Sequence, residues 1–233
     1  MHLRHKPLKY HGIAAIAVCG TLAATVGCSS SGGQHTDSKP SIKTSTASQP
    51  ADARPLEASK LRAFLLTTSD LGSGYVQSPE KEDEASQYDD IGADGCPALE
   101  KLAKQSDRMK FAVKATAEFK YDEDSELGEE LYSDTPSALS SKLRAVMNAW
   151  TSCPTFTMTS GSTPISIKVS KSAPPQVGEE QYAYTTTIDL PARPQVFKTA
   201  AVRQGNVVVM LTGAPALVDR HIETAVAKIS PTS

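Results

Sequence analysis

Histidine is nearly absent from the part of the chain that can fold. Four of the five histidines lie within the first 35 residues, and His221 is the only one after Leu56. Hydrolytic triads need a base, usually histidine, so this scarcity argues against that class of enzyme. A zinc site needs three or four His, Cys or carboxylate ligands, which one histidine and a pair of cysteines do not supply. We therefore expect no catalytic residue, no metal site and no cofactor.

Three alternative roles for polar residues stay open: catalysis by a histidine, catalysis by a carboxylate pair, and calcium binding. His221 borders the apolar stripe of a predicted final helix, where packing or a solvated surface explains a histidine better than catalysis does. Carboxylate pairs of the glycosidase kind are not excluded by counting, although no spacing singles out a pair. The acidic run Asp122–Glu126 lacks the glycine and the terminal glutamate of an EF-hand, which favours a solvated loop over a calcium site.

An excess of positive charge is also missing. The chain has 24 Lys and Arg against 26 Asp and Glu, and three of the basic residues lie before Cys28, where no acidic residue occurs. The remaining part therefore carries a net charge of about −5, with acidic clusters at 80–90 and 122–130. Nucleic acid binding requires a basic face that neutralises phosphates, so we exclude nucleic acid as a partner.

No apolar run is long enough to span a membrane comfortably. The uncharged stretch Gly12–Gly27 follows three basic residues, Arg4, Lys6 and Lys9, with no acidic residue before it. A spanning helix needs roughly 20 apolar residues, and this shorter pattern is typical of a secretory signal peptide. We therefore predict that residues 1–27 form a signal peptide and that the protein is exported.

The end of that run, Thr25-Val26-Gly27-Cys28, resembles the bacterial lipobox. In that family the cysteine sulfur receives a diacylglycerol, and a peptidase cuts just before the cysteine. Gly27 suits the small position before the cut, whereas Thr25 departs from the usual leucine. A plain signal peptide with an incidental cysteine is the alternative, but Cys28 lies where the apolar run meets a polar tract, as an anchor requires. The resemblance implies an exported lipoprotein held by Cys28 on the outer face of the cell membrane.

The composition divides the remaining chain in two. Residues 28–55 are rich in Ser, Thr, Gly, Gln and Pro and cannot bury enough apolar surface to order themselves, which predicts a disordered linker. From Leu56 the composition becomes globular and no internal repeat is present, so residues 56–233 should form one domain. Its two cysteines, Cys96 and Cys153, are expected to form a disulfide after export, with a reactive cysteine using His221 as base as the alternative.

Periodicity predicts the elements of this domain. Apolar residues at helical spacing predict four helices, and alternation of apolar and polar residues predicts six strands. Phe111 to Tyr121 is the clearest strand, and the sequence Gln204-Gly205-Asn206 is a hairpin signal between two others. The last strand is apolar on both faces and should be central. The helices are 59–66, 96–103, one from Thr135 to Cys153 and a final one around 218–229; the other strands are 128–133, 165–169, 182–190, 196–203 and 207–212. The pattern predicts a single α+β domain with an antiparallel sheet flanked by helices.

Several stretches together resemble the extracellular sensor domain of the PknH-type mycobacterial kinases, which is found detached in many actinobacterial lipoproteins. They are Trp150-Thr151-Ser152-Cys153 at a predicted helix end, Cys96 upstream, and the segments LLTTSDLGSGY and VRQGNVVVML. The resemblance covers residues 56 to 231 and implies a sandwich with a cleft for an extracellular ligand. Family members usually carry two disulfides, and this chain has cysteines for one. It has neither the kinase nor its membrane helix, so it could not pass a signal across the membrane alone.

Three functions follow as hypotheses. The first is a non-enzymatic binding or sensing lipoprotein that holds a small molecule, lipid or glycan. The second is an interaction lipoprotein that docks on an envelope protein, which a broad exposed apolar patch would favour. The third is a hydrolase that uses two close carboxylates, one with a raised pKa. We expect the first, with Tyr182 and Tyr184 as candidate ligand contacts because they share a strand face with Ile188, although core packing also explains them.

Overall fold

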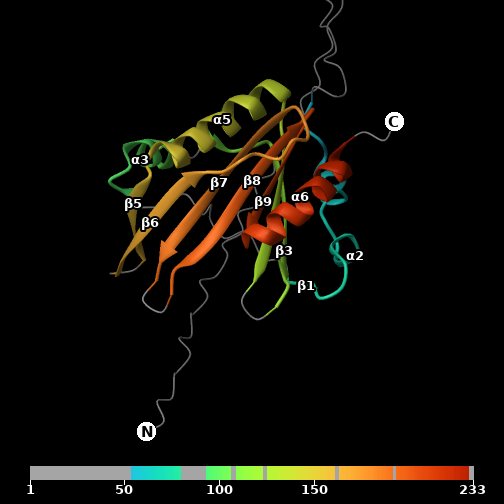
Figure 1. Ribbon diagram of the computed structural model, residues 1–233. Helices are drawn as coiled ribbons and strands as arrows, with labels where there is room; N and C mark the ends of the chain where they lie inside the picture. The colour runs from blue at the N-terminus through green and yellow to red at the C-terminus, as the bar shows by residue number, and fades with distance from the viewer. Residues whose placement is uncertain are drawn as a thin grey trace, which may run out of the picture. The chain divides into compact units, whose positions relative to one another are not determined.

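The computed structural model describes residues 54–79, 93–105, 109–122, 125–160, 163–190 and 193–230. All of them belong to one unit, Ala47–Ser233. Within this part of the chain, nine strands form one antiparallel sheet with helices on both faces (Figure 1). The predicted α+β domain with an antiparallel sheet is therefore confirmed.

The strand order in the sheet is β1-β3-β4-β9-β8-β7-β6-β5-β2. The strands are β1 (Val76–Gln77), β2 (Ala93–Asp94), β3 (Val113–Lys120), β4 (Glu126–Ser133), β5 (Thr155–Ser160), β6 (Thr163–Lys171), β7 (Glu180–Asp189), β8 (Gln195–Gln204) and β9 (Val207–Gly213). The helices are α1 (Ala58–Arg62), α2 (Thr68–Leu71), α3 (Pro97–Ala103), α5 (Pro136–Ser152) and α6 (Pro215–Ile229).

Strand β9 lies between β4 and β8, as its apolar sequence predicts. Residues 207–211 of this strand are all buried, because both faces of the central sheet are covered. The turn that joins β8 to β9 contains Gly205 with φ of +58°, a left-handed conformation that glycine adopts at low cost.

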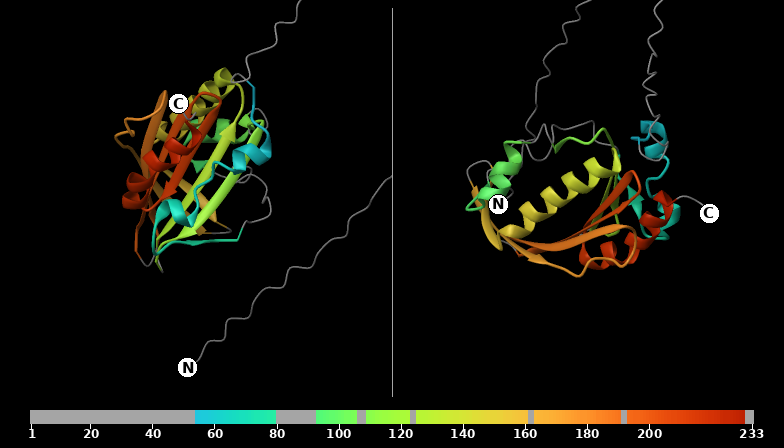
Figure 2. Two further views of the ribbon diagram at one scale, coloured as in Figure 1. Left: turned by 90° about the vertical axis from the view of Figure 1, so that its right-hand side faces the viewer. Right: turned by 90° about the horizontal axis from the view of Figure 1, so that it is seen from above.

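The two faces of the sheet bury separate cores. Figure 2 shows α3 and α5 on one side, with the sheet curving around α5, and α6 on the other side. Alternation along the strands sends one set of side chains to each helix layer. The α5 side buries, among others, Leu139, Leu143, Met147, Phe156, Ile167 and Tyr184. The α6 side buries, among others, Leu61, Leu66, Phe119, Leu131, Val209 and Ile222.

Helix α5 begins as its sequence predicts. The Thr135 hydroxyl accepts a hydrogen bond from the Ala138 amide at 3.4 Å, and Pro136 occupies the first turn. The buried stripe runs through Met147, whereas Val146 and Trp150, which helical spacing from Leu139 and Leu143 predicts to be buried, are half-buried. The helix is therefore rotated slightly from the expected orientation, which leaves Trp150 half-buried.

The chain from Leu56 to Tyr75, which we call the N-terminal arm, lies on the α6 side of the sheet. Helix α1 ends at Arg62, short of the predicted Leu66, and α2 follows with a capping box between Thr67 and Asp70. Two glycines with positive φ, Gly72 and Gly74, then turn the chain. Tyr75 is only 7 % exposed, so this turn places the tyrosine against the core.

Two strand predictions need correction. Strand β3 begins at Val113, and Phe111 packs on Tyr132 on the α5 side, not with Val113 to Tyr121 on the α6 side as alternation implied. A bend at Ala112 breaks the alternation and turns the ring to the other face. The sequence analysis does not predict β1, β2 or β5. Strands β1 and β2 have two residues each, which is too short to show alternation, and β5 has only Phe156 and Met158 facing the core.

Several sequence predictions lie outside the described residues. They are the signal peptide, Cys28, the linker up to residue 53 and the whole acidic cluster at 80–90. In the described part of the chain, no helix combines the length and the apolar character needed to cross a bilayer.

Candidate functional site

An aromatic cluster forms where the C-terminal half of α5 meets β5 and β7. The Trp150 ring stacks on the Tyr184 ring with 5.7 Å between centroids and 10° between planes. It also meets Phe156 edge-on, with centroids 5.9 Å apart. Three half-buried side chains on the same sheet face, Met158, Ile165 and Ile188, pack against this core. We call these six residues the aromatic patch; none is charged, so the patch suits an uncharged ligand with apolar surface.

A row of hydroxyl groups leads from the aromatic patch toward the surface. Tyr184 is 6 % exposed and hydrogen-bonds the Thr199 side chain; burial raises the pKa of Tyr184 to about 12. The Thr199 and Thr212 hydroxyl oxygens lie 3.1 Å apart, and Thr212 is exposed. Neutral donors and acceptors on β7, β8 and β9 therefore stand beside an apolar surface, and an apolar lining with a few placed polar groups is typical of small-molecule sites.

Tyr182 occupies a different environment. Its hydroxyl donates to Glu180 Oε1 at 2.7 Å, and Arg203 Nε donates to Glu180 Oε2 at 3.2 Å. Burial raises the pKa of Tyr182, and the hydrogen bond to Glu180 raises it further. Burial also acts to raise the pKa of Glu180, but hydrogen bonds from Tyr182, Ser140 and Arg203 outweigh it and the pKa is lowered. Tyr182 therefore belongs to a charged network with its hydroxyl already engaged.

A polar hollow of about 500 Å³ lies on the outer side of α5. Arg144 connects it to the network around Tyr182, because its Nη2 lies 3.5 Å from Glu180 Oε1. The Arg144 side chain is 63 % exposed, so this ion pair is loose. The lining residues are Ser137, Ser140, Ser141, Arg144, Ala145 and Asn148. These are the small and polar residues of the solvent-facing side of a helix, which by themselves favour no particular ligand.

The two tyrosines predicted as ligand contacts thus share a sheet face but not a site. Tyr184 packs in the aromatic patch, and Tyr182 joins the Glu180 network near the middle of α5. Their role in ligand binding stays a prediction. Trp150 continues the helical spacing of Leu139 and Leu143, which favours a core position, and no sequence pattern singles out Thr199 or Thr212. Their positions on two paired strands, with side chains on one face, become apparent only from the register.

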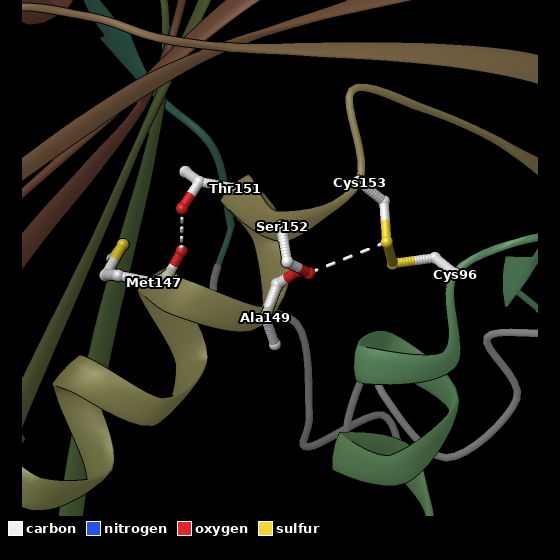
Figure 3. Close-up of a disulfide and its surroundings, with 6 residues drawn as sticks. All are labelled: Cys96, Met147, Ala149, Thr151, Ser152 and Cys153. Carbon is white, nitrogen blue, oxygen red and sulfur yellow. Dashed lines mark hydrogen bonds between the residues drawn. A yellow bond between two sulfur atoms is a disulfide. The ribbon is translucent and has the colours of Figure 1, made fainter.

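The predicted disulfide between Cys96 and Cys153 is present, with Cα atoms 5.7 Å apart (Figure 3). It joins the start of α3 to the residue that follows α5, so it fixes both helices on the α5 side. Near the end of α5, the Thr151 hydroxyl donates to the Met147 carbonyl at 2.8 Å. The covalent link therefore holds the helix that carries Trp150.

His221 lies in the core of the α6 side. It is 4 % exposed, and its Nε2 shares a hydrogen bond of 2.7 Å with the Tyr75 hydroxyl. Burial and the nearby positive charge of Arg220 lower the pKa of His221. Packing is thus the interpretation that the structure supports for this histidine. In the described ranges, no three His, Cys, Asp or Glu side chains gather as a metal ion would require.

Comparison with known proteins supplies a fold relative. No family model matches the chain, and no curated protein matches it either. Among solved structures, the chain is similar to the extracellular domain of PknH from Mycobacterium tuberculosis, with a TM-score of 0.53 and 12 % sequence identity. The match covers 76 % of this chain and 97 % of that domain. The two proteins therefore share a fold over nearly the whole of the PknH domain.

Proposed function

We propose that the protein is an exported lipoprotein whose folded domain is a non-enzymatic binding or sensing module outside the cell. The observation that carries the proposal is the fold shared with an extracellular domain. The disulfide supports the same compartment, because disulfides persist in oxidising surroundings and are rare in the cytosol.

The anchor in this proposal is a diacylglycerol on the Cys28 sulfur. Each buried methylene contributes about 0.8 kcal/mol to membrane binding, so two acyl chains hold a protein stably on a bilayer. A flexible tether of the length of residues 29–55 allows the domain to reach roughly 30 Å from the anchor.

The aromatic patch is the surface that we propose for the ligand. The ring of Trp150 and the side chains of Ile165 and Ile188 are half-buried, so apolar surface remains at the edge of the core. Stacking on a tryptophan and hydrogen bonds to threonine hydroxyls suit a glycan or another uncharged, hydroxyl-bearing molecule.

The other two hypotheses find less support. Among the described residues, the large hydrophobic side chains that are well exposed are Val76 and Val196, at 67 % and 46 %, and they lie on different strands. They do not form the broad apolar patch that an interaction lipoprotein would present. Among the described residues, the carboxyl whose pKa is raised is that of Glu129, which is 1 % exposed inside the core, where no substrate reaches it.

Replacing Cys28 with Ala tests the anchor. We expect the C28A protein to appear in the medium, because no acyl chain can be attached, while the matched variant Cys19→Ala stays in the membrane fraction. Fractionation followed by immunoblotting measures both. Membrane retention of the C28A protein would contradict the anchor.

Native mass spectrometry of the protein purified from its host membrane tests the binding function. We expect a co-purifying small molecule, and we expect Ile165→Lys to reduce its occupancy at least tenfold because a charge then enters the aromatic patch. Ser166→Lys is the matched control, since it places the same charge on the other face of β6. Equal occupancy in both variants would remove the aromatic patch as the site, and absence of any adduct would contradict the binding function.

A further inference from the structure

A carboxyl group lies inside the α6-side core with one of its two oxygens lacking a hydrogen-bond partner among the described residues. Glu129 of β4 stands on the same strand face as Leu127 and Leu131, and only 1 % of it is exposed. Its Oε2 accepts a hydrogen bond from the Leu66 amide at 2.7 Å. Its Oε1 is also buried and has no hydrogen-bond partner in the described part of the chain. A buried polar atom without a partner is costly, so the group calls for an explanation.

The amide that Glu129 holds belongs to the N-terminal arm. Leu66 is itself 1 % exposed and joins α1 to α2. Three further contacts attach the arm to the sheet and to α6. They are the Leu56 amide to Ser133 Oγ at 2.9 Å, the Asp70 carboxylate to Lys228 at 2.6 Å, and the Tyr75 hydroxyl to His221 at 2.7 Å. Glu129 provides the contact at the centre of the arm.

The charges around Glu129 do not neutralise it. The residues opposite it on β3 and β9 are Ala117 and Leu211. From α6, Lys228 exerts an attraction, but it is paired with Asp70 of α2, which repels a negative charge on Glu129. Burial raises the pKa of Glu129 to about 7, an effect that the Leu66 amide and Lys228 only partly offset.

The remaining titratable groups near this core point elsewhere. On α1, Lys60 and Arg62 are exposed. On α6, the Arg220 guanidinium lies over the Tyr121 ring, 5.8 Å from its centroid, and His221 is hydrogen-bonded to Tyr75. Within the described residues, none of these groups is hydrogen-bonded to the Glu129 carboxyl.

We propose that Glu129 is a proton-operated latch for the N-terminal arm: the neutral carboxyl keeps the arm seated on the sheet, and the ionised carboxylate loosens it. An ionised carboxylate with one amide partner must gain water, and the sheet cannot open to admit it. The arm consists of two short helices joined by turns, whereas β4 is hydrogen-bonded to a strand on each side, so the arm moves more readily than the sheet. This latch does not depend on the proposed ligand or anchor.

Amide hydrogen exchange of the full chain, measured between pH 5 and 8.5 and corrected for intrinsic rates, tests the latch. The open arm leaves Glu129 with the ordinary pKa of an exposed glutamate. The protection of the Leu66 amide should therefore fall about tenfold per pH unit between pH 5 and 7 and level off above pH 7. Glu129→Gln should abolish this dependence, and Glu130→Gln, on the opposite face of β4, should leave it unchanged. Protection independent of pH in the wild type, or the same dependence in E129Q, would overturn the proposal.

Two variants keep the test decisive if Glu129→Gln does not fold. Asp70→Asn and Lys228→Met both remove the same ion pair. Asp70→Asn removes a repelling charge, so the pH above which the protection of the Leu66 amide stays constant should fall. Lys228→Met removes an attracting charge, so that pH should rise. Loss of packing alone would move both variants in the same direction, and that result would refute the latch. A Glu129 carboxyl-carbon NMR titration with a midpoint near pH 4.5 in the wild type would refute it as well.

Discussion

The two faces of the sheet are held by different chemistry. The α5 side is an aromatic and aliphatic core tied covalently by the Cys96–Cys153 disulfide. The α6 side has no such link in the described residues, and it buries three of the four buried polar side chains of that part of the chain, Glu129, Ser133 and His221. We therefore expect the α5 side to respond to reduction and the α6 side to respond to pH, although a single layer of strands separates them.

Removing the disulfide should have the largest effect, because this covalent link distinguishes the α5 side from the α6 side. The bond closes a loop of 57 residues, so replacing both cysteines with serine should lower the free energy of unfolding by roughly 4 kcal/mol. Urea denaturation measures the loss, and reduction of the wild-type protein should reproduce it while leaving the double variant unchanged. A loss under about 1 kcal/mol would mean that the α5-side core holds without its covalent link.

The next effect concerns pH and the α6 side. Folding raises the pKa of Glu129 from 4.5 to about 7, so its contribution is full below pH 4.5 and is lost as the pH rises to 7, by about 3 kcal/mol. His221 has the opposite sign: its lowered pKa means that stability is lost as the pH falls below 6.5.

Comparison of the wild type with Glu129→Gln separates these two contributions. The stability of E129Q relative to the wild type should rise by about 3 kcal/mol between pH 4.5 and 8, as measured by urea denaturation. His221 is present in both proteins, so its contribution cancels. A relative stability that stays constant over this range would show that the α6 side is no more pH-sensitive than the α5 side.

A smaller effect tests how tightly the α6-side core is packed. Gly178 has φ of +79°, and a Cβ there would lie 2.3 Å from Val202 Cγ1. Gly178→Ala should therefore lower the free energy of unfolding by roughly 2 kcal/mol, from backbone strain and from the clash together. Gly72→Ala is the matched control, because its φ of +90° carries the strain but a Cβ there meets no atom within 4 Å. Equal losses would indicate that Val202 moves aside and that this core is loosely packed.

The smallest effect compares one helix cap on each face. Thr67 caps α2 on the α6 side and Thr135 caps α5 on the α5 side, so replacing either with Ala should cost about 1 kcal/mol. The response should differ in kind. Thr67→Ala should increase hydrogen exchange mainly in the N-terminal arm, whereas Thr135→Ala should lower the global urea midpoint. Faster exchange of the arm in Thr135→Ala would show that the two faces are coupled.

The fold was largely predictable because long elements carry a visible period. Strand β7 and helices α5 and α6 repeat their apolar positions several times, so their type and faces follow from sequence. Strand β5 was missed because threonine on its outer face and only two inward apolar residues give a weak signal. Alternation predicts the wrong face for Phe111, because the bend at Ala112 shifts the alternation by one residue. No local sequence pattern indicates this bend.

The candidate sites were less predictable, because they depend on which strands become neighbours. Alternation alone could have found Glu129, since it lies between Leu127 and Leu131 on one strand face. That the same position meets the Leu66 amide, 63 residues earlier, depends on the docking of the arm. The row Tyr184, Thr199 and Thr212 likewise requires the register of three consecutive strands, β7, β8 and β9, because periodicity within one strand does not say which residues lie opposite one another.

The strand order has a consequence for association between copies of this protein. Strands β1 and β2 follow one another along the chain, yet they form the two opposite borders of the sheet. A chain shortened from its amino end past Asp94 would lose both borders at once and leave β3 and β5 with unsatisfied main-chain groups. Exposed strand edges recruit further strands, so such a fragment should polymerise edge to edge in both directions instead of remaining monomeric.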